Sequence, residues 1–127
     1  MDKINFNLEN LGQVLSKLNI DDINALEFGV IGFDDECIVR LYNSYESKMA
    51  ALPLESVIDA DYFNCVAPCM NNFLVAQKFE DAIDDKVNLD EVMDYVLTLK
   101  MKPTRVKLRL ISGPQLPLNY LAILRLN

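Results

Sequence analysis

The chain has 127 residues, of which 51% are hydrophobic, enough for one domain with its own core. Aspartate and glutamate outnumber lysine and arginine by 19 to 12, and the net charge of −7 argues against nucleic acid as a partner, because phosphate binding needs clustered cations. Histidine is absent, which excludes Ser-His-Asp and Cys-His catalysis and leaves no acid–base–nucleophile set, so we do not expect an enzyme.

The start of the chain and its cysteines favour a reducing compartment. No apolar run reaches the roughly 18 residues of a membrane span, and the first residues lack the pattern of a signal peptide. We therefore expect a cytoplasmic protein that does not bind membranes. Cys37, Cys65 and Cys69 are too few and too unevenly spaced for a disulfide framework. Without histidine they also make a poor zinc site, so we expect no metal.

The first half of the chain is predicted to form a helical cap and then the first strands of a sheet. Leucines recur at helical spacing between residues 8 and 18, which predicts the first helix. The acidic turn of the hairpin that follows contains no glycine. The elements expected next are a short helix at 21–26, strands at 29–33 and 37–42, helical turns over 43–53, a compact stretch over 54–63 and a loop over 64–69.

The second half is predicted to hold one long helix and three strands. Val75, Phe79 and Ile83 share one face of an amphipathic helix over 73–85. Alternating apolar residues then predict strands at 93–101, 106–110 and 118–126. This order predicts an α+β domain with a five-stranded antiparallel sheet flanked by helices. We expect a single domain over 1–127, divided into an N-terminal cap at 1–26 and a core at 27–127.

Several short motifs at fixed distances resemble the photoactive yellow protein family, which are light sensors of the PAS fold. They include Leu-Glu-Phe-Gly-Val-Ile at 26–31, the pair Tyr42-Asn43 followed by Glu46, and Val-Ala-Pro-Cys ending at Cys69. A Met-Lys-Pro-Thr-Arg-Val turn at 101–106 matches as well. The resemblance extends from about residue 6 to residue 126, nearly the whole chain.

The resemblance implies a chromophore and a mechanism. Cys69 aligns with the cysteine that carries p-coumaric acid as a thioester, and Tyr42 and Glu46 align with the residues that hydrogen-bond its phenolic oxygen. Light isomerises the chromophore in that family, the aligned glutamate gives up its proton, and the N-terminal cap loosens. A separate downstream signalling protein and a monomer or weak dimer are then expected. The other expected pocket residues are Ala50, Leu52, Val66, Ala67, Pro68 and Met101.

The chemistry of Tyr42 and Glu46 agrees with this role. A phenol in water has a pKa near 10, so holding it ionised inside a protein needs charge-assisted hydrogen bonds. The Tyr42 hydroxyl can always donate such a bond. The Glu46 carboxyl can donate only when protonated, which burial favours by raising its pKa.

Two pocket positions depart from the family pattern, and an alternative function stays open. Ala50 stands where a threonine is usual and Leu52 where an arginine is usual, so we expect a more apolar pocket without that guanidinium. Each residue alone has an ordinary explanation: Cys69 as a buried thiol, Glu46 as a surface charge. The alternative is a PAS-fold sensor or protein-interaction module that binds another small ligand or none.

Overall fold

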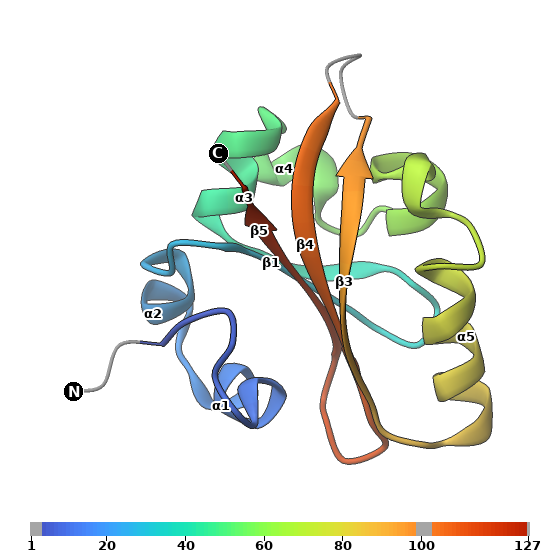
Figure 1. The fold of residues 1–127 in the computed structure, drawn as a ribbon. Coiled ribbons are helices and arrows are strands. Elements are labelled where there is room, and N and C mark those ends of the chain that lie inside the picture. The colour runs from blue at the N-terminus through green and yellow to red at the C-terminus, as the bar shows by residue number, and fades with distance from the viewer. Residues whose placement is uncertain (1–3, 99–102, 127) are drawn as a thin grey trace.

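One five-stranded antiparallel sheet organises the protein, as predicted. The computed structural model describes residues 4–98 and 103–126, and Figure 1 shows the sheet at its centre. The strand order is β2-β1-β5-β4-β3, so the first and last strands of the chain pair in the middle of the sheet. The bounds are β1 Gly29–Phe33, β2 Val39–Tyr42, β3 Leu89–Leu97, β4 Thr104–Ser112 and β5 Asn119–Arg125.

The N-terminal segment covers one face of this sheet. It contains helices α1 (Leu11–Lys17) and α2 (Ile20–Asn24), close to the two predicted helices. Asn19 caps the start of α2: its side-chain oxygen accepts a hydrogen bond from the Asp22 amide at 2.9 Å. The N-terminal segment and α1 pack against the sheet in a separate hydrophobic cluster, which includes Phe6, Leu11, Leu15, Phe28, Val30 and Tyr120.

Short helices and one long helix cover the opposite face (Figure 1). This face holds the larger hydrophobic core, in which the rings of Phe33, Tyr62, Phe63 and Phe79 pack against one another. Tyr62 stacks on Phe33 with ring centroids 6.2 Å apart. The elements are α3 Ser44–Ala50, α4 Leu54–Val57, η1 Tyr62–Val66, η2 Pro68–Met70 and α5 Ala76–Asp85.

The clearest differences from the predicted elements are at 64–69 and at the start of β3, and β4 is also longer than predicted, Thr104–Ser112 rather than 106–110. The segment expected as a loop over 64–69 overlaps a π-helical turn, η1, and a 3₁₀ turn, η2. β3 begins at Leu89 rather than Met93, because the alternation of inward and outward residues continues back to that point. The turn between β1 and β2 needs a left-handed residue, and Cys37 supplies it with a φ of 66° where glycine would be usual.

Over 4–98 and 103–126, no helix combines the length and the apolar character needed to cross a bilayer.

Candidate functional site

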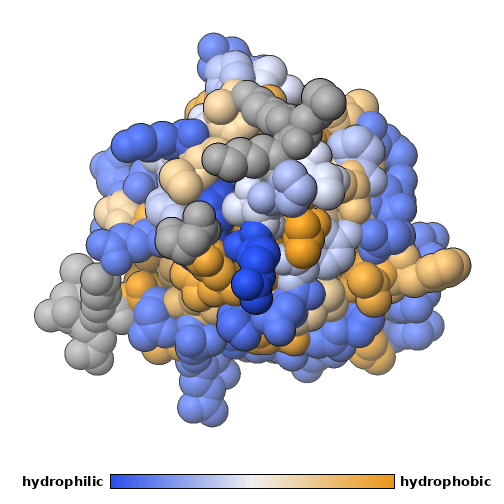
Figure 2. All heavy atoms as spheres, turned by 45° about the horizontal axis from the view of Figure 1, so that its top comes forward, coloured by the Kyte–Doolittle hydropathy of each residue, from blue (hydrophilic) through white to orange (hydrophobic). Residues whose placement is uncertain are grey.

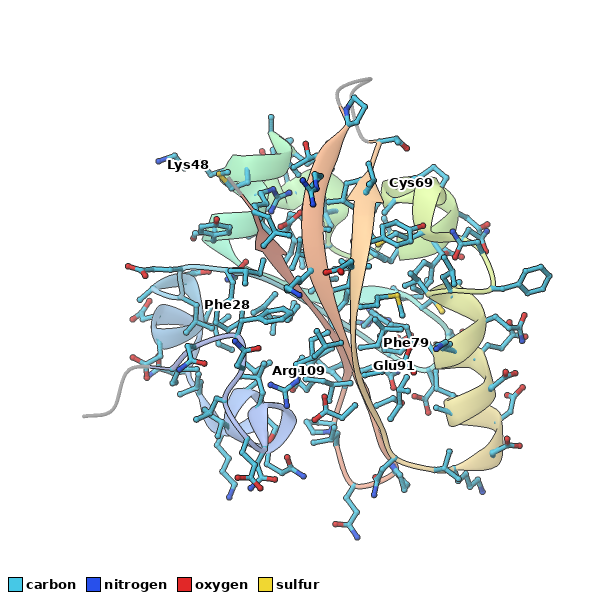
Figure 3. The ribbon with its side chains drawn as sticks, viewed as in Figure 1. Phe28, Lys48, Cys69, Phe79, Glu91 and Arg109 are labelled. Carbon is cyan, nitrogen blue, oxygen red and sulfur yellow. The ribbon has the colours of Figure 1, made fainter. Side chains whose placement is uncertain are left out.

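Cys69 lies in η2, on the core face of the sheet (Figure 3), and its thiol is free and half-buried. The backbone around it is fixed by β3, since the Tyr95 hydroxyl donates to the Cys69 carbonyl at 2.7 Å. The Asn72 side-chain amide donates to the same carbonyl at 3.2 Å. This anchoring leaves the Cys69 side chain packed against the large core.

The other two cysteines differ from Cys69 in their surroundings. Burial raises the pKa of the Cys37 thiol to about 11, and the nearby acidic side chains, Asp61 foremost, act in the same direction. Cys37 therefore stays a thiol at neutral pH, which makes it a weak nucleophile. Cys65 is exposed on the surface. Cys37 and Cys69 both lie half-buried against the large core, but the Cys37 thiol is held protonated by its raised pKa, which leaves Cys69 as the better candidate for attachment.

Glu46 is a buried carboxyl group in the first turn of α3, with only 1% of the residue exposed. Asn43 caps this helix: its side-chain oxygen accepts from the Glu46 amide at 3.1 Å and from the Val30 amide at 3.0 Å. Gly29 of β1 leaves the space that the carboxyl group occupies. A Cβ atom at Gly29 would lie 2.1 Å from Oε1 and 3.2 Å from Cβ of Glu46, so a larger residue here would displace the Glu46 side chain.

Arg125 forms a two-point ion pair with Glu46. Its Nη1 donates to Oε1 at 2.6 Å and its Nη2 to Oε2 at 3.1 Å. The side chains are 9% and 2% exposed, respectively, so water screens the pair little. Arg125 is the last residue of β5, and it was not among the site residues predicted from the sequence. Leu52 stands where an arginine is usual, but Arg125 supplies a guanidinium to Glu46 instead.

Two tyrosines complete a polar cluster inside the large core. Tyr42 is 4% exposed and Tyr62 2% exposed. Burial raises the pKa of both hydroxyls, and the negative charge of Glu46 raises them further. Burial likewise raises the pKa of Glu46, against the opposing hydrogen bonds and charge of Arg125. Tyr42, Glu46, Tyr62 and Arg125 together form the polar cluster, and a negative charge on Cys69 would raise the pKa of Tyr62 further, so the cysteine lies within electrostatic range of this cluster.

The structure brings most of the predicted pocket residues to the core face. Ala50 and Ala67 are buried, and Leu52 and Val66 pack partly buried against the large core. Pro68 is exposed and starts the 3₁₀ turn of Cys69, which suits a role in shaping the turn. Met101 lies outside the described residues.

Hydrogen bonds connect the polar cluster to the N-terminal cap. The Asn43 side chain, which caps the Glu46 helix, donates to the Ile23 carbonyl at 3.1 Å and to the Phe28 carbonyl at 3.0 Å. Ile23 belongs to α2 of the cap. The Ser44 amide at the start of α3 also donates to the Asn24 side chain of α2 at 2.9 Å, so two side chains connect the start of α3 to the cap.

A second buried arginine holds the cap on the opposite face of the sheet. Arg109 of β4 donates to the Phe6 carbonyl at 2.9 Å and the Leu8 carbonyl at 2.7 Å, and pairs with Asp90 at 2.8 Å. Figure 3 shows Arg109 between the strands and the N-terminal helices. The cap is thus attached by directed hydrogen bonds as well as by apolar packing.

The described residues show neither a broad hydrophobic patch on the face in Figure 2 nor a metal site. Hydrophobic side chains form small, separate areas on the face shown in Figure 2, divided by hydrophilic ones. No group of three or more Cys, Asp or Glu side chains among the described residues could hold a metal ion. The buried polar cluster on the core face is therefore the candidate functional site.

Comparison with known proteins identifies relatives over most of the chain. A photoactive yellow protein from Halochromatium salexigens is 30% identical over 110 residues, covering 87% of both chains. A photoactive yellow protein from Rhodothalassium salexigens is 26% identical, covering 89% of this chain and 92% of the relative. No family model matches the chain.

Solved structures give the same result for the fold. The photoactive yellow protein domain of the sensor histidine kinase Ppr from Rhodospirillum centenum superposes with a TM-score of 0.80 at 26% identity, covering 88% of this chain and 97% of that domain. The PAS domain of BvgS from Bordetella pertussis matches with a TM-score of 0.58 at 13% identity, covering 94% and 87%. This second match supports the PAS fold alone, and the predicted fold class is confirmed.

Proposed function

Because the chain belongs to the photoactive yellow protein family, we propose that it is a blue-light receptor that carries p-coumaric acid as a thioester on Cys69. Membership in this family agrees with the expectation of a light sensor and not an enzyme. The observation that carries the proposal is the placement of the free, half-buried Cys69 thiol on the same core face as a buried set of hydroxyl and guanidinium donors.

The donor set suits a phenolic ligand held in its ionised form. Tyr42 and Tyr62 carry hydroxyl groups whose raised pKa keeps them protonated, so both can donate. Arg125 adds a positive charge in a poorly screened site, where charge-assisted hydrogen bonds are strongest. Such a set can stabilise a phenolate that water alone would leave protonated at neutral pH.

When bound, p-coumaric acid supplies a double bond that light converts from trans to cis. Glu46 would then act as the proton donor, since its burial raises the pKa of the carboxyl group and favours the protonated form. Loss of that proton leaves a carboxylate charge at the start of α3. Asn43 connects this helix to Ile23 of the cap, so the same change would loosen the cap.

Attachment can be tested on the purified chain with p-coumaric anhydride as acyl donor. The Cys69 sulfur forms the new bond to the carbonyl carbon, the bond to the leaving carboxylate breaks, and the thiol proton goes to solvent. We expect the intact mass to rise by one coumaroyl group in the wild-type chain and in Cys65→Ala, but not in Cys69→Ala. A mass increase in Cys69→Ala as large as that of the wild type would overturn the assignment of Cys69 as the attachment site.

The signalling partner and the assembly remain predictions. We propose that a separate downstream protein reads the loosened cap and that the receptor is a cytoplasmic monomer or weak dimer. The division into a cap at 1–26 and a core at 27–127 belongs to the same proposal. The similar domain of Ppr is part of a sensor histidine kinase.

One observation favours the alternative of a different small ligand. A surface groove of about 400 Å³ lies beside Tyr42, within the usual size range of ligand sites. Its apolar walls include Leu41, Leu54 and Ile58, and among the described residues neither Cys69 nor Glu46 lines it. A chain that gains no mass from p-coumaric anhydride would favour this groove as the binding site.

A further inference from the structure

The charges of the polar cluster are balanced before any ligand is present. Glu46 contributes one negative charge and Arg125 one positive charge, joined by two hydrogen bonds of 2.6 and 3.1 Å. Such two-point geometry matches a guanidinium to an ionised carboxylate. Among the described residues, Arg125 is also the cation that acts on Tyr42 and Tyr62.

A phenolate in this cluster would bring a second negative charge. One guanidinium can neutralise one anion, and two anions in a buried site repel strongly because water screens them little. The least costly remedy is a proton on one of them. The carboxyl group is the better site for it, since a protonated Glu46 can still donate a hydrogen bond to the phenolate.

We propose that Arg125 is the shared counter-ion of this site: it neutralises the Glu46 carboxylate in the unloaded chain and the phenolate in the loaded chain, where Glu46 takes up a proton. The proposal rests on the proposed function and deepens it. It explains how a chain with Leu52 in place of the usual arginine supplies the positive charge. It also gives the origin of the proton that Glu46 later donates.

The position of Arg125 in the sheet supports this role. Gly29 of β1 pairs with Ile123 of β5, and Arg125 follows two residues later, so its side chain leaves β5 on the same side as Ile123. That side is the face of the large core. The titratable groups that act on the Glu46–Arg125 pair come from α3 (Tyr45), β2 (Tyr42) and η1 (Tyr62). None of these carries a competing positive charge.

Infrared spectroscopy of the carboxyl group tests the proposal in both states. Subtracting the spectrum of Glu46→Gln isolates the Glu46 signal. We expect no protonated-carboxyl band from Glu46 in the unloaded wild type at neutral pH, and a clear band after loading with p-coumaric anhydride. In unloaded Arg125→Gln the band should already be present, while Arg125→Lys, which keeps the charge, should lack it.

Arg105 of β4 offers a matched control, because it is an exposed arginine on the strand that pairs with β5. Arg105→Gln should give the same Glu46 infrared signal as the wild type, both before and after loading. In the loaded protein, Arg125→Gln should raise the pH at which the yellow colour is lost by about 1–3 units, since the phenolate loses its counter-ion.

Three results would overturn the proposal. The first is a band of protonated Glu46 in the unloaded wild type, and the second is the absence of that band after loading. The third is an Arg125→Gln variant whose Glu46 infrared signal is the same as that of Arg105→Gln. A chain that never gains the coumaroyl mass refutes the proposed function and the loaded half of this inference together. The infrared spectra of the unloaded wild type and Arg125→Gln would then still decide whether Arg125 keeps Glu46 ionised.

Discussion

Removal of Arg125 should make the stability of the unloaded protein depend on pH in a specific way. Arg125→Gln leaves the Glu46 carboxyl group, whose side chain is 2% exposed, without a counter-ion. A carboxylate stranded in such a site takes up a proton instead, so its pKa in the folded state rises far above the unfolded value of 4.5. Holding that proton at pH 7 costs about 3 kcal/mol, because each unit between 4.5 and 7 corresponds to about 1.4 kcal/mol.

The sign follows from the raised pKa. Between the unfolded and folded pKa values, the folded variant binds more protons than the unfolded chain, so its stability falls as the pH rises. The difference in free energy of unfolding between wild type and Arg125→Gln, measured with urea, should therefore grow between pH 5 and pH 7 by up to about 3 kcal/mol; the wild type shares part of this pH dependence, because burial already raises the pKa of its Glu46. Glu46→Gln combined with Arg125→Gln should remove this pH dependence, and Arg105→Gln should not introduce it. An equal wild-type–variant difference at both pH values would refute the reasoning.

Three further outcomes test other parts of the structure. Gly29→Ala should displace the Glu46 carboxyl group from Arg125. The loss of stability between pH 5 and pH 7 that is expected for Arg125→Gln should therefore appear in this variant too, although no charge has been removed. Tyr62→Phe should reduce the loss of stability between about pH 9 and about pH 11, because the raised pKa of Tyr62 gives stability that is present below pH 10 and lost above it; unchanged urea midpoints at high pH would contradict this. Arg109→Gln should weaken attachment of the cap by about 2–4 kcal/mol, seen as faster proteolysis within residues 4–18, whereas the exposed Arg40→Gln should leave it unchanged.

Much of the fold could be predicted from local patterns. Helical spacing placed α1 and α5, and alternation placed β4 and β5, because each buries one face against the sheet. The start of β3 was missed because Glu91 takes an inward position there, paired with Lys78 from α5. A carboxylate at an inward position breaks the apolar pattern that marks a strand.

The candidate site was only partly predictable, because it joins distant parts of the chain. Cys69, Tyr42 and Glu46 lie in motifs that the sequence displays directly. Arg125 lies 79 residues from its partner Glu46, and nothing local indicates that it turns inward. One signal was available: a glycine at position 29 of the apolar strand 29–33 suggests a close approach by another group. Identifying that group requires the register between β1 and β5.

Visible absorption under illumination tests the central claim most directly. The chain loaded with p-coumaric anhydride should be yellow at neutral pH, should lose that colour under blue light, and should regain it in the dark. Cys69→Ala treated in the same way should remain colourless. A wild-type chain that carries the coumaroyl mass on Cys69 yet shows no reversible change of colour under blue light would contradict its assignment as a light receptor.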